Sequence, residues 1–305
     1  MDKIQLKLLE EVAGIHEIPE GAYSIRVNGA IQGKNSSENI EIVKKDGVAG
    51  IDIYIKPGTK KESLHIPVIL SQAGIKELVY NDFHVGEDCD VTIVAGCGIH
   101  NGGSEDSEHS GIHSFFVSKN ARVKYIEKHY GQGDGNGKRI MNPQTYVELE
   151  ENAYLEMETA QIKGVDSTKR STKAKVAKNA TLIVNEKVMT HGSQYAETEF
   201  EVELNGTGAG THVVSRSVAR DKSSQKFVSR IKGNSDCSGH TECDAIIMDD
   251  ATVVAIPEIM AVHPDASLIH EAAIGKIAGE QLIKLMTLGL TEKEAEEEII
   301  NGFLR

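Results

Sequence analysis

Apolar residues along this chain change their spacing twice. In the first dozen residues, Ile4, Leu8 and Val12 recur among charged side chains at the spacing of one helix face, and Gly14 favours an end there. From Tyr23 onward, short apolar and β-branched segments are bounded by Gly, Asn, Asp or Pro, which is the pattern of strands and turns. The sequence therefore predicts an N-terminal helix followed by a β body.

The predicted strands alternate apolar and polar residues, as in residues 122–128 (RVKYIEK). They include residues 24–27, 40–43, 51–55, 198–204 and 212–218. Residues 75–80 fit either a short helix or a strand.

A short unit recurs within the β body: Asn or Asp, then a small residue, then an alternating run. The small residue is Cys89, Ala121, Ala153, Ala180, Ala251 and Ala266, at steps of 32, 32, 27, 71 and 15. Steps near 15 or its double indicate one repeated structural unit. Asn and Asp tolerate the left-handed conformation of a tight turn, and a small residue fits where one coil crowds the next.

Repeats of this kind bury a continuous core only by stacking on one another. We therefore predict a mainly β fold, a parallel β-helix (solenoid). A β-sandwich is the alternative, because the strands alternate with Gly-rich turns, but two-residue hairpin signals are scarce.

Helical spacing returns at the C-terminus. Residues 271–286 (EAAIGKIAGEQLIKLM) place Ile274 and Leu285 on one helix face, and Thr291 to Glu294 form a capping box that opens a second helix. We expect three parts in the chain. They are an N-terminal helix and mixed segment (1–85), a β-helix core (86–270) and a C-terminal helical hairpin (271–305).

Composition narrows the class of protein. Aromatic residues make up 5% of the 305 residues, there is no Trp and there are 29 Gly, a mix that favours regular stacking of small and β-branched side chains. The net charge of −13 argues against nucleic-acid partners and anionic membranes. The N-terminus is charged throughout, and no segment approaches the ~20 apolar residues of a membrane span. Four cysteines make no disulfide framework, so we expect a reduced, soluble, cytoplasmic protein.

Residues 237–243 (CSGHTEC) are the richest group of metal-ligand side chains. Thiolate and imidazole suit iron, zinc and iron–sulfur clusters. The spacing of Cys237 and Cys243 is not that of a zinc ribbon, and no second cysteine pair completes a tetrahedron. The alternative is that one or both are small buried core residues.

The other two cysteines differ in their surroundings. Cys89 occupies the same turn position as Ala121, so we expect it to pack as a small hydrophobe. Cys97 stands between Gly96 and Gly98, which is consistent with an exposed thiol or with a core residue in a tight turn.

Two histidine-containing segments are candidates for metal binding. His100, His109 and His113 lie in a segment rich in Gly, Ser and acids, which could bind a divalent metal. We favour a solvated insertion between two coils. His270 and Glu271 fall where the predicted β body meets the C-terminal helices, where a plain helix start is the alternative.

Signatures of conventional enzymes are missing from the sequence. Residues 131–138 (GQGDGNGK) resemble a phosphate loop, but Gln132 replaces a required Gly and Arg139 replaces the Ser or Thr that binds Mg²⁺. No helix pattern follows. We therefore expect a protein that is not an enzyme. A β-helix enzyme acting on polysaccharide is a further alternative, weakened by the scarcity of aromatic residues.

The C-terminal third resembles the SufB/SufD family of iron–sulfur cluster assembly scaffolds. The residues that carry the resemblance are Thr241-Glu242-Cys243-Asp244, Pro257-Glu258, residues 270–277 (HEAAIGKI), 280–282 (EQL), 289–290 (GL), 294–295 (EA) and 300–303 (INGF). The solenoid repeat extends the resemblance more weakly back to about residue 86.

The resemblance implies a right-handed parallel β-helix with a transient iron–sulfur cluster as its cargo. Cys243 resembles a cysteine that SufB proteins use for nascent cluster assembly. Glu271 resembles a carboxylate important in SufB, His270 resembles a histidine important in SufD, and Cys97 looks like a SufB cysteine that follows Gly. A metal site would then use Cys243, Glu271 and His270.

The resemblance also implies partners. A SufC-type ABC ATPase docks on the C-terminal helical part and supplies ATP hydrolysis, while a sulfur donor and apo-acceptor proteins complete the system. Because Cys243, His270 and Glu271 occur together, we expect a homodimer, with a heterodimer containing a SufD-like subunit as the alternative. The chain departs from the family in its shorter N-terminal region and in Thr287-Leu288, where Ser-Arg is usual. The alternative function is a SufD-like structural subunit that binds no cluster.

Overall fold

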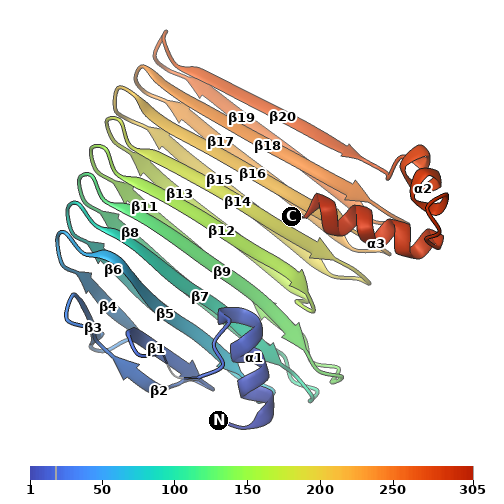
Figure 1. Ribbon diagram of the computed structural model, residues 1–305, viewed down its shortest axis with the longest axis horizontal. Coiled ribbons are helices and arrows are strands. Elements are labelled where there is room, and N and C mark those ends of the chain that lie inside the picture. The colour runs from blue at the N-terminus through green and yellow to red at the C-terminus, as the bar shows by residue number, and fades with distance from the viewer. Residues whose placement is uncertain (18, 305) are drawn as a thin grey trace.

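The computed structural model describes residues 1–17 and 19–304, which form a solenoid of two stacked ten-stranded sheets (Figure 1). Sheet A contains β1 (Ala22–Val27), β2 (Ala30–Asn35), β5 (Lys60–Leu70), β7 (Asp90–His100), β9 (Arg122–Gln132), β12 (Tyr154–Lys163), β14 (Thr181–Thr190), β16 (Ala209–Ala219), β18 (Cys237–Ile247) and β20 (Ser267–Gly275). Sheet B contains β3 (Ile40–Lys44), β4 (Gly50–Ile55), β6 (Lys76–Val85), β8 (Ser107–Val117), β10 (Arg139–Met141), β11 (Gln144–Leu149), β13 (Ser167–Val176), β15 (Tyr195–Leu204), β17 (Ser224–Gly233) and β19 (Thr252–Ala261). The helices are α1 (Lys3–Ala13), α2 (Gly279–Met286) and α3 (Glu292–Phe303).

Successive coils stack in parallel, which confirms the predicted fold class. Tyr154 pairs in register with Arg122 in the coil before it and with Thr181 in the coil after it, so these two coils take 32 and 27 residues. Parallel stacking produces about 8 turns. Antiparallel pairing occurs only at the N-terminal end of the described residues, between β1 and β2 and between β3 and β4. Residues 75–80, left open between helix and strand, lie mostly in β6.

The turn unit seen in the sequence has the predicted backbone at four of its six copies. Asp88, Asn120, Asn152 and Asn179 all have φ between 54° and 60°. The side chains of the first three form a ladder, in which the Asn152 amide donates to Asn120 at 3.0 Å and the Asn120 amide donates to Asp88 at 3.1 Å.

The prediction is wrong at the last two copies of this turn. Asp249 takes the left-handed conformation in place of Asp250, and Asp265 is not left-handed. The turns that end at Ala251 and at Ala121 are closed by the same hydrogen bond, from the amide of the fourth residue to the carbonyl of the first, but the left-handed residue is the second in the former turn and the third in the latter.

The main core lies between the two sheets, and the helices cover parts of its outside (Figure 1). On α1, Leu8 and Val12 are buried against sheet A. A Cβ at Gly96 would lie 2.8 Å from the Val12 carbonyl oxygen, so a glycine is needed for this close approach. At the other end, Ile300 of α3 is buried against Val218.

The C-terminal helix prediction is correct for α3 and wrong in part for α2. Thr291 caps α3 with the predicted capping box to Glu294. The predicted helix over 271–286 begins only at Gly279, because residues up to Gly275 belong to β20 and pair in parallel with β18. Residues 271–275 therefore form part of a strand although their apolar residues have helical spacing, because pairing with β18 outweighs the local preference. Among the described helices, none is long and apolar enough to cross a membrane.

Candidate functional site

The last coil leaves one end of the solenoid uncovered. β20 is the final strand of sheet A and β19 is the final strand of sheet B. Ile259 and Ile274 stand at inward positions of these strands, since they pair with buried Ile231 and Ala245. They are nevertheless 44% and 39% exposed because no further coil covers them.

Cys243 points into the interior just before this open end. It lies on β18 opposite Ala272 of β20, and it is 1% exposed. Burial, with smaller contributions from the charges of Glu186 and Asp244, raises the pKa of the Cys243 thiol to about 12. At neutral pH the thiol is therefore protonated, and a metal ion would have to displace its proton.

His270 occupies the same inward row as Cys243. Its Nδ1 lies 2.5 Å from the hydroxyl of Thr241, which is its register partner and stands two residues before Cys243. Burial, and to a lesser degree the charge of His240, lowers the pKa of His270. The structure therefore places a thiol and an imidazole on the same inward face of adjacent strands.

Glu271 lies on the opposite face of the sheet. It is the register partner of outward-facing Glu242, its side chain is 65% exposed, and a carboxylate oxygen lies 3.8 Å from Nε2 of His240. His240 in turn stacks on His212, with ring centroids 4.8 Å apart. Within the described part of the chain, no group of three or more His, Cys, Asp or Glu side chains is placed to hold a metal ion. A single copy therefore does not bring Glu271 to Cys243.

Cys97 is far from this edge, in β7, and it is a core residue, as one of the two interpretations predicted, although it lies in a strand and not in a tight turn. Gly96 and Gly98 lie in a strand and face α1, so Cys97 points inward and is 2% exposed. Burial, then the charges of Glu77 and Glu127, raise its thiol pKa well above the usual value. Its register partner on the next coil is His129.

Of the other candidate residues, Cys89, Cys237, His109 and His113 also face the interior, whereas His100, the last residue of β7, is half-buried. Cys89 is fully buried at the turn, as predicted, and Cys237 is 5% exposed. The predicted solvated insertion ends before His109 and His113, because both are buried on inward positions of β8. His109 Nδ1 lies 3.0 Å from a Glu77 carboxylate oxygen.

A row of buried polar side chains crosses the interior, and the sequence analysis missed it. We call it the interior polar row: Asn81, His113, Tyr125, Glu127, Arg170, Glu186 and Ser215. The sequence pattern that could have revealed this row lies in β9, where Tyr125, Glu127 and His129 follow Val123 at alternating, inward-facing positions.

Contacts along the interior polar row are continuous from Asn81 to Glu127. The Asn81 amide lies 3.3 Å from Nε2 of His113, whose Nδ1 lies 2.8 Å from the Tyr125 hydroxyl. The Tyr125 hydroxyl donates to Glu127 at 3.1 Å. Burial lowers the pKa of His113 to about 4, so its ring is neutral at pH 7.

Arg170 is the one cation within the interior polar row. Its guanidinium donates to Glu127 at 2.6 Å and lies 3.8 Å from Glu186, which accepts a hydrogen bond from Ser215 at 2.8 Å. Burial alone would raise the pKa of Glu127, but the charges of Arg170 and His129 hold it well below the usual value. At Glu186, burial has a larger effect than the charge of Arg170, and the pKa of Glu186 is raised. Since Ser215 is the register partner of Cys243, the row leads to the candidate thiol.

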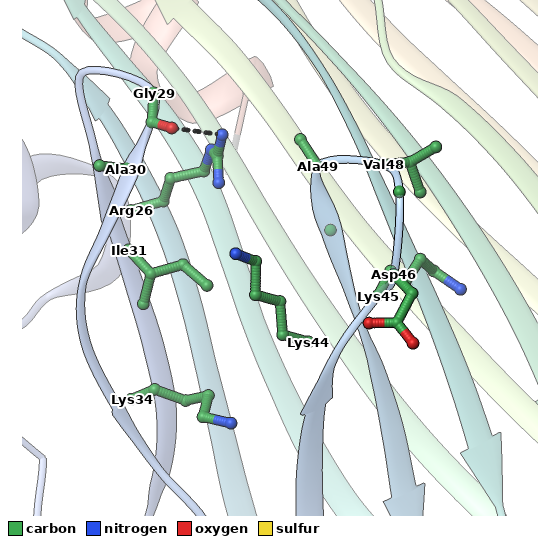
Figure 2. A pocket seen from close by; sticks show the side chains of 12 residues that line it. Arg26, Gly29, Ala30, Ile31, Lys34, Lys44, Lys45, Asp46, Val48 and Ala49 are labelled. Carbon is green, nitrogen blue, oxygen red and sulfur yellow. Dashed lines mark hydrogen bonds between the residues drawn. The ribbon is translucent and has the colours of Figure 1, made fainter.

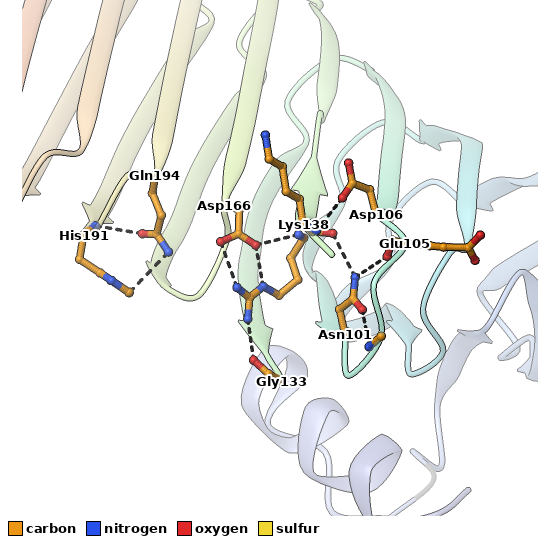
Figure 3. Close-up of polar contacts among 10 residues, drawn as sticks. Asn101, Glu105, Asp106, Gly133, Lys138, Asp166, His191 and Gln194 are labelled. Atoms are coloured by element: carbon orange, nitrogen blue, oxygen red, sulfur yellow. Dashed lines mark hydrogen bonds and ion pairs between the residues drawn. The ribbon is translucent and has the colours of Figure 1, made fainter. Parts of the chain in front are cut away.

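The Gly-rich residues 131–138 form the end of β9 and the loop that leads to β10 (Figure 3). Arg139 donates to both carboxylate oxygens of Asp166, at 2.7 and 3.0 Å, and to the Gly133 carbonyl at 3.0 Å. The Lys138 amide donates to Asp106 at 2.8 Å. These contacts tie the loop to neighbouring coils, and strand β10 follows it where a phosphate loop would be followed by a helix.

Comparisons with known proteins agree on one family. The family model for the SUF system FeS cluster assembly SufBD core domain matches residues 77–303. The chain is similar to the iron–sulfur cluster assembly SufBD family protein of Archaeoglobus fulgidus, with 29% identity over 278 residues that cover 89% of this chain and 72% of the relative. For the SufBD family protein of Methanocaldococcus jannaschii the values are 28% identity over 268 residues, 87% and 84%. For one from Pyrococcus horikoshii they are 28% over 283 residues, 90% and 84%.

Proposed function

Since this chain belongs to the SufB/SufD family of iron–sulfur cluster assembly proteins, we propose that it is a scaffold on which a transient cluster is built at the open C-terminal end of the solenoid. The cluster is cargo in this proposal, and ATP hydrolysis comes from a SufC-type partner. A sulfur donor delivers sulfide equivalents, and apo-proteins receive the finished cluster in the cytoplasm.

The observation that carries the proposal is the position of Cys243 and His270. Both face inward on the last two strands of sheet A, β18 and β20, and no further coil covers β20. Thiolate and imidazole suit iron and iron–sulfur clusters. Ligands at an uncovered edge of the solenoid can move apart, and this favours release of the cluster to an acceptor protein.

Anaerobic reconstitution tests this proposal directly. The purified chain, incubated with ferrous iron, sulfide and a thiol reductant, should acquire visible absorbance together with stoichiometric iron and acid-labile sulfide. The pKa of Cys243 is raised to about 12, so yield should increase with pH as proton displacement becomes easier. A protein that stays colourless at every pH would contradict the scaffold proposal.

The alternative proposal is a SufD-like structural subunit that binds no cluster. It is favoured by one observation, the 1% exposure of Cys243. A colourless chain that still binds the ATPase would support this alternative, whereas cluster binding would exclude it.

We further propose that two copies meet at the open end. Ile259 and Ile274 belong to the core alternation but lack a covering coil, and Glu271 is separated from Cys243 within one copy. A second copy would cover the apolar ends and bring a second set of ligands to the edge. A heterodimer with a SufD-like subunit would use the same surface.

The Ile259→Lys variant should convert this dimer to a monomer, because a charge would enter the contact. Light scattering and sedimentation measure the change in mass. The matched control is Ile162→Lys, since Ile162 is 42% exposed near the end of β12, away from the last coil. A wild-type chain that is monomeric at tens of micromolar would refute the homodimer.

The ATPase partner is proposed to dock on α2 and α3. Ile283, Met286 and Leu288 present 63%, 43% and 77% of their surface to solvent within this short helical hairpin. Leu288→Glu should therefore weaken binding of a SufC-type ATPase at least tenfold by calorimetry, with Leu78→Glu as the control because Leu78 is 45% exposed on β6. Equal loss in both variants would place the docking surface elsewhere.

A further inference from the structure

A basic cleft lies at the end of the solenoid opposite Cys243. Two antiparallel hairpins, β1–β2 and β3–β4, form its walls, and its volume is about 790 Å³ (Figure 2). We call it the N-terminal basic cleft. It is lined by Arg26, Lys34, Lys44, Lys45 and Asp46, by the start of β2 and by the turns that follow β1 and β3. Asp46 is its single acidic lining residue against four cations, in a chain whose net charge is −13.

Two of the cations are held in place by the fold. The Arg26 guanidinium donates to Glu77 at 2.7 Å and to the Gly29 carbonyl at 2.6 Å. Lys34 donates from Nζ to the carbonyl of Ile42 at 2.9 Å, so the lysine of one hairpin is tied to the other. The two contacts to carbonyl oxygens leave the positive charges of Lys34 and Arg26 uncompensated. The carboxylate of Glu77, however, offsets the charge of Arg26.

Lys44 and Lys45 differ although they are neighbours. Lys45 contacts the carboxylates of Asp52 and Asp82, which compensate its charge. Lys44 points instead into the space between the hairpins, toward the Arg26 guanidinium (Figure 2). Lys44 therefore brings a positive charge into the shared opening, where Glu77 already offsets the charge of Arg26, and this charge attracts an anion.

We propose that the N-terminal basic cleft binds a small ligand that carries two or more oxyanion groups, such as a pyrophosphate. Lysine and arginine on separate hairpins can each contact one group of such a ligand, and the arginine fork suits phosphate or carboxylate oxygens. The volume exceeds what one phosphate needs. None of the described residues that line the cleft is aromatic, so a nucleoside base would find no stacking surface.

Calorimetric titration of the full chain with pyrophosphate, citrate and ADP tests the proposal. Pyrophosphate should bind saturably with one site per chain, and more weakly as salt is raised. Lys34→Gln combined with Lys44→Gln should weaken binding at least tenfold. Citrate binding as tight as that of pyrophosphate would support a ligand class that includes carboxylates, and binding of pyrophosphate alone would support a phosphate ligand.

Three results would overturn the proposal. They are the absence of saturable binding at millimolar pyrophosphate, an unchanged affinity in the double variant, and ADP binding more than tenfold tighter than pyrophosphate. The control is Lys173→Gln with Lys175→Gln, two exposed lysines of β13 that pair with surface glutamates. An equal loss in this control would identify nonspecific attraction. If the double variant unfolds, the affinity for pyrophosphate is measured instead in Lys44→Gln alone, because Lys44 is at an exposed position.

Discussion

Alanine in place of Cys243 is expected to remove most of the iron and acid-labile sulfide that the reconstituted wild-type protein holds. Cys243 supplies the thiol of the candidate site, and its inward position beside the open end leaves no second cysteine in register with it. Iron–sulfur clusters depend on thiolate ligands. Loss of this one group should therefore reduce both counts at least tenfold, measured by iron assay, sulfide assay and absorbance.

The matched control is Cys89→Ala, since Cys89 is also buried but occupies a turn position where Ala121 stands in the next coil. It should bind as much iron and sulfide as the wild-type protein. Circular dichroism must show that both variants are folded, since truncating a buried side chain usually costs about 1 kcal/mol. Undiminished cluster content in Cys243→Ala would remove Cys243 from the site.

Replacement of Arg170 by methionine is expected to lower the free energy of unfolding by about 3–5 kcal/mol. Arg170 is 6% exposed and is the cation that faces two buried carboxylates, Glu127 and Glu186. Methionine fills similar space but leaves Glu127 without its charged partner in the interior. An uncompensated buried charge is costly, and Glu127 should then take up a proton at a higher pH than in the wild-type protein.

Urea unfolding followed by circular dichroism measures this change as a shift in the midpoint. The control is Arg230→Met. Arg230 also contacts two glutamates, Glu199 and Glu258, but its side chain is 39% exposed. Exposed ion pairs contribute about 0–1 kcal/mol, so the midpoint should move little. Similar shifts in the two variants would show that the interior polar row contributes no more than a surface pair.

The site could be predicted only in part because register decides which residues meet. Cys243, His270 and Glu271 were identified from a family resemblance. Their chemistry is readable from the sequence, but the face of the sheet on which each lies is not. Adjacent residues of a strand point to opposite faces, so once β20 continues through residue 271, His270 faces the interior and Glu271 faces solvent. The predicted helix at this point would have placed both side chains differently.

The repetitive part of the fold could be predicted from local sequence patterns alone. Alternating apolar residues, and turns in which Asn120 or Asn152 precedes a small residue, act within a few neighbouring positions, and they were sufficient to predict a solenoid. The capping box at Thr291 is local in the same way. Only the tertiary structure decided the long-range contacts. Three features depend on how the coils stack and where the last coil ends. They are the ion pair between Glu127 and Arg170, the inward orientation of the Cys97 side chain on the strand that α1 covers, and the uncovered end beside Cys243. Local propensity carries no information about those contacts.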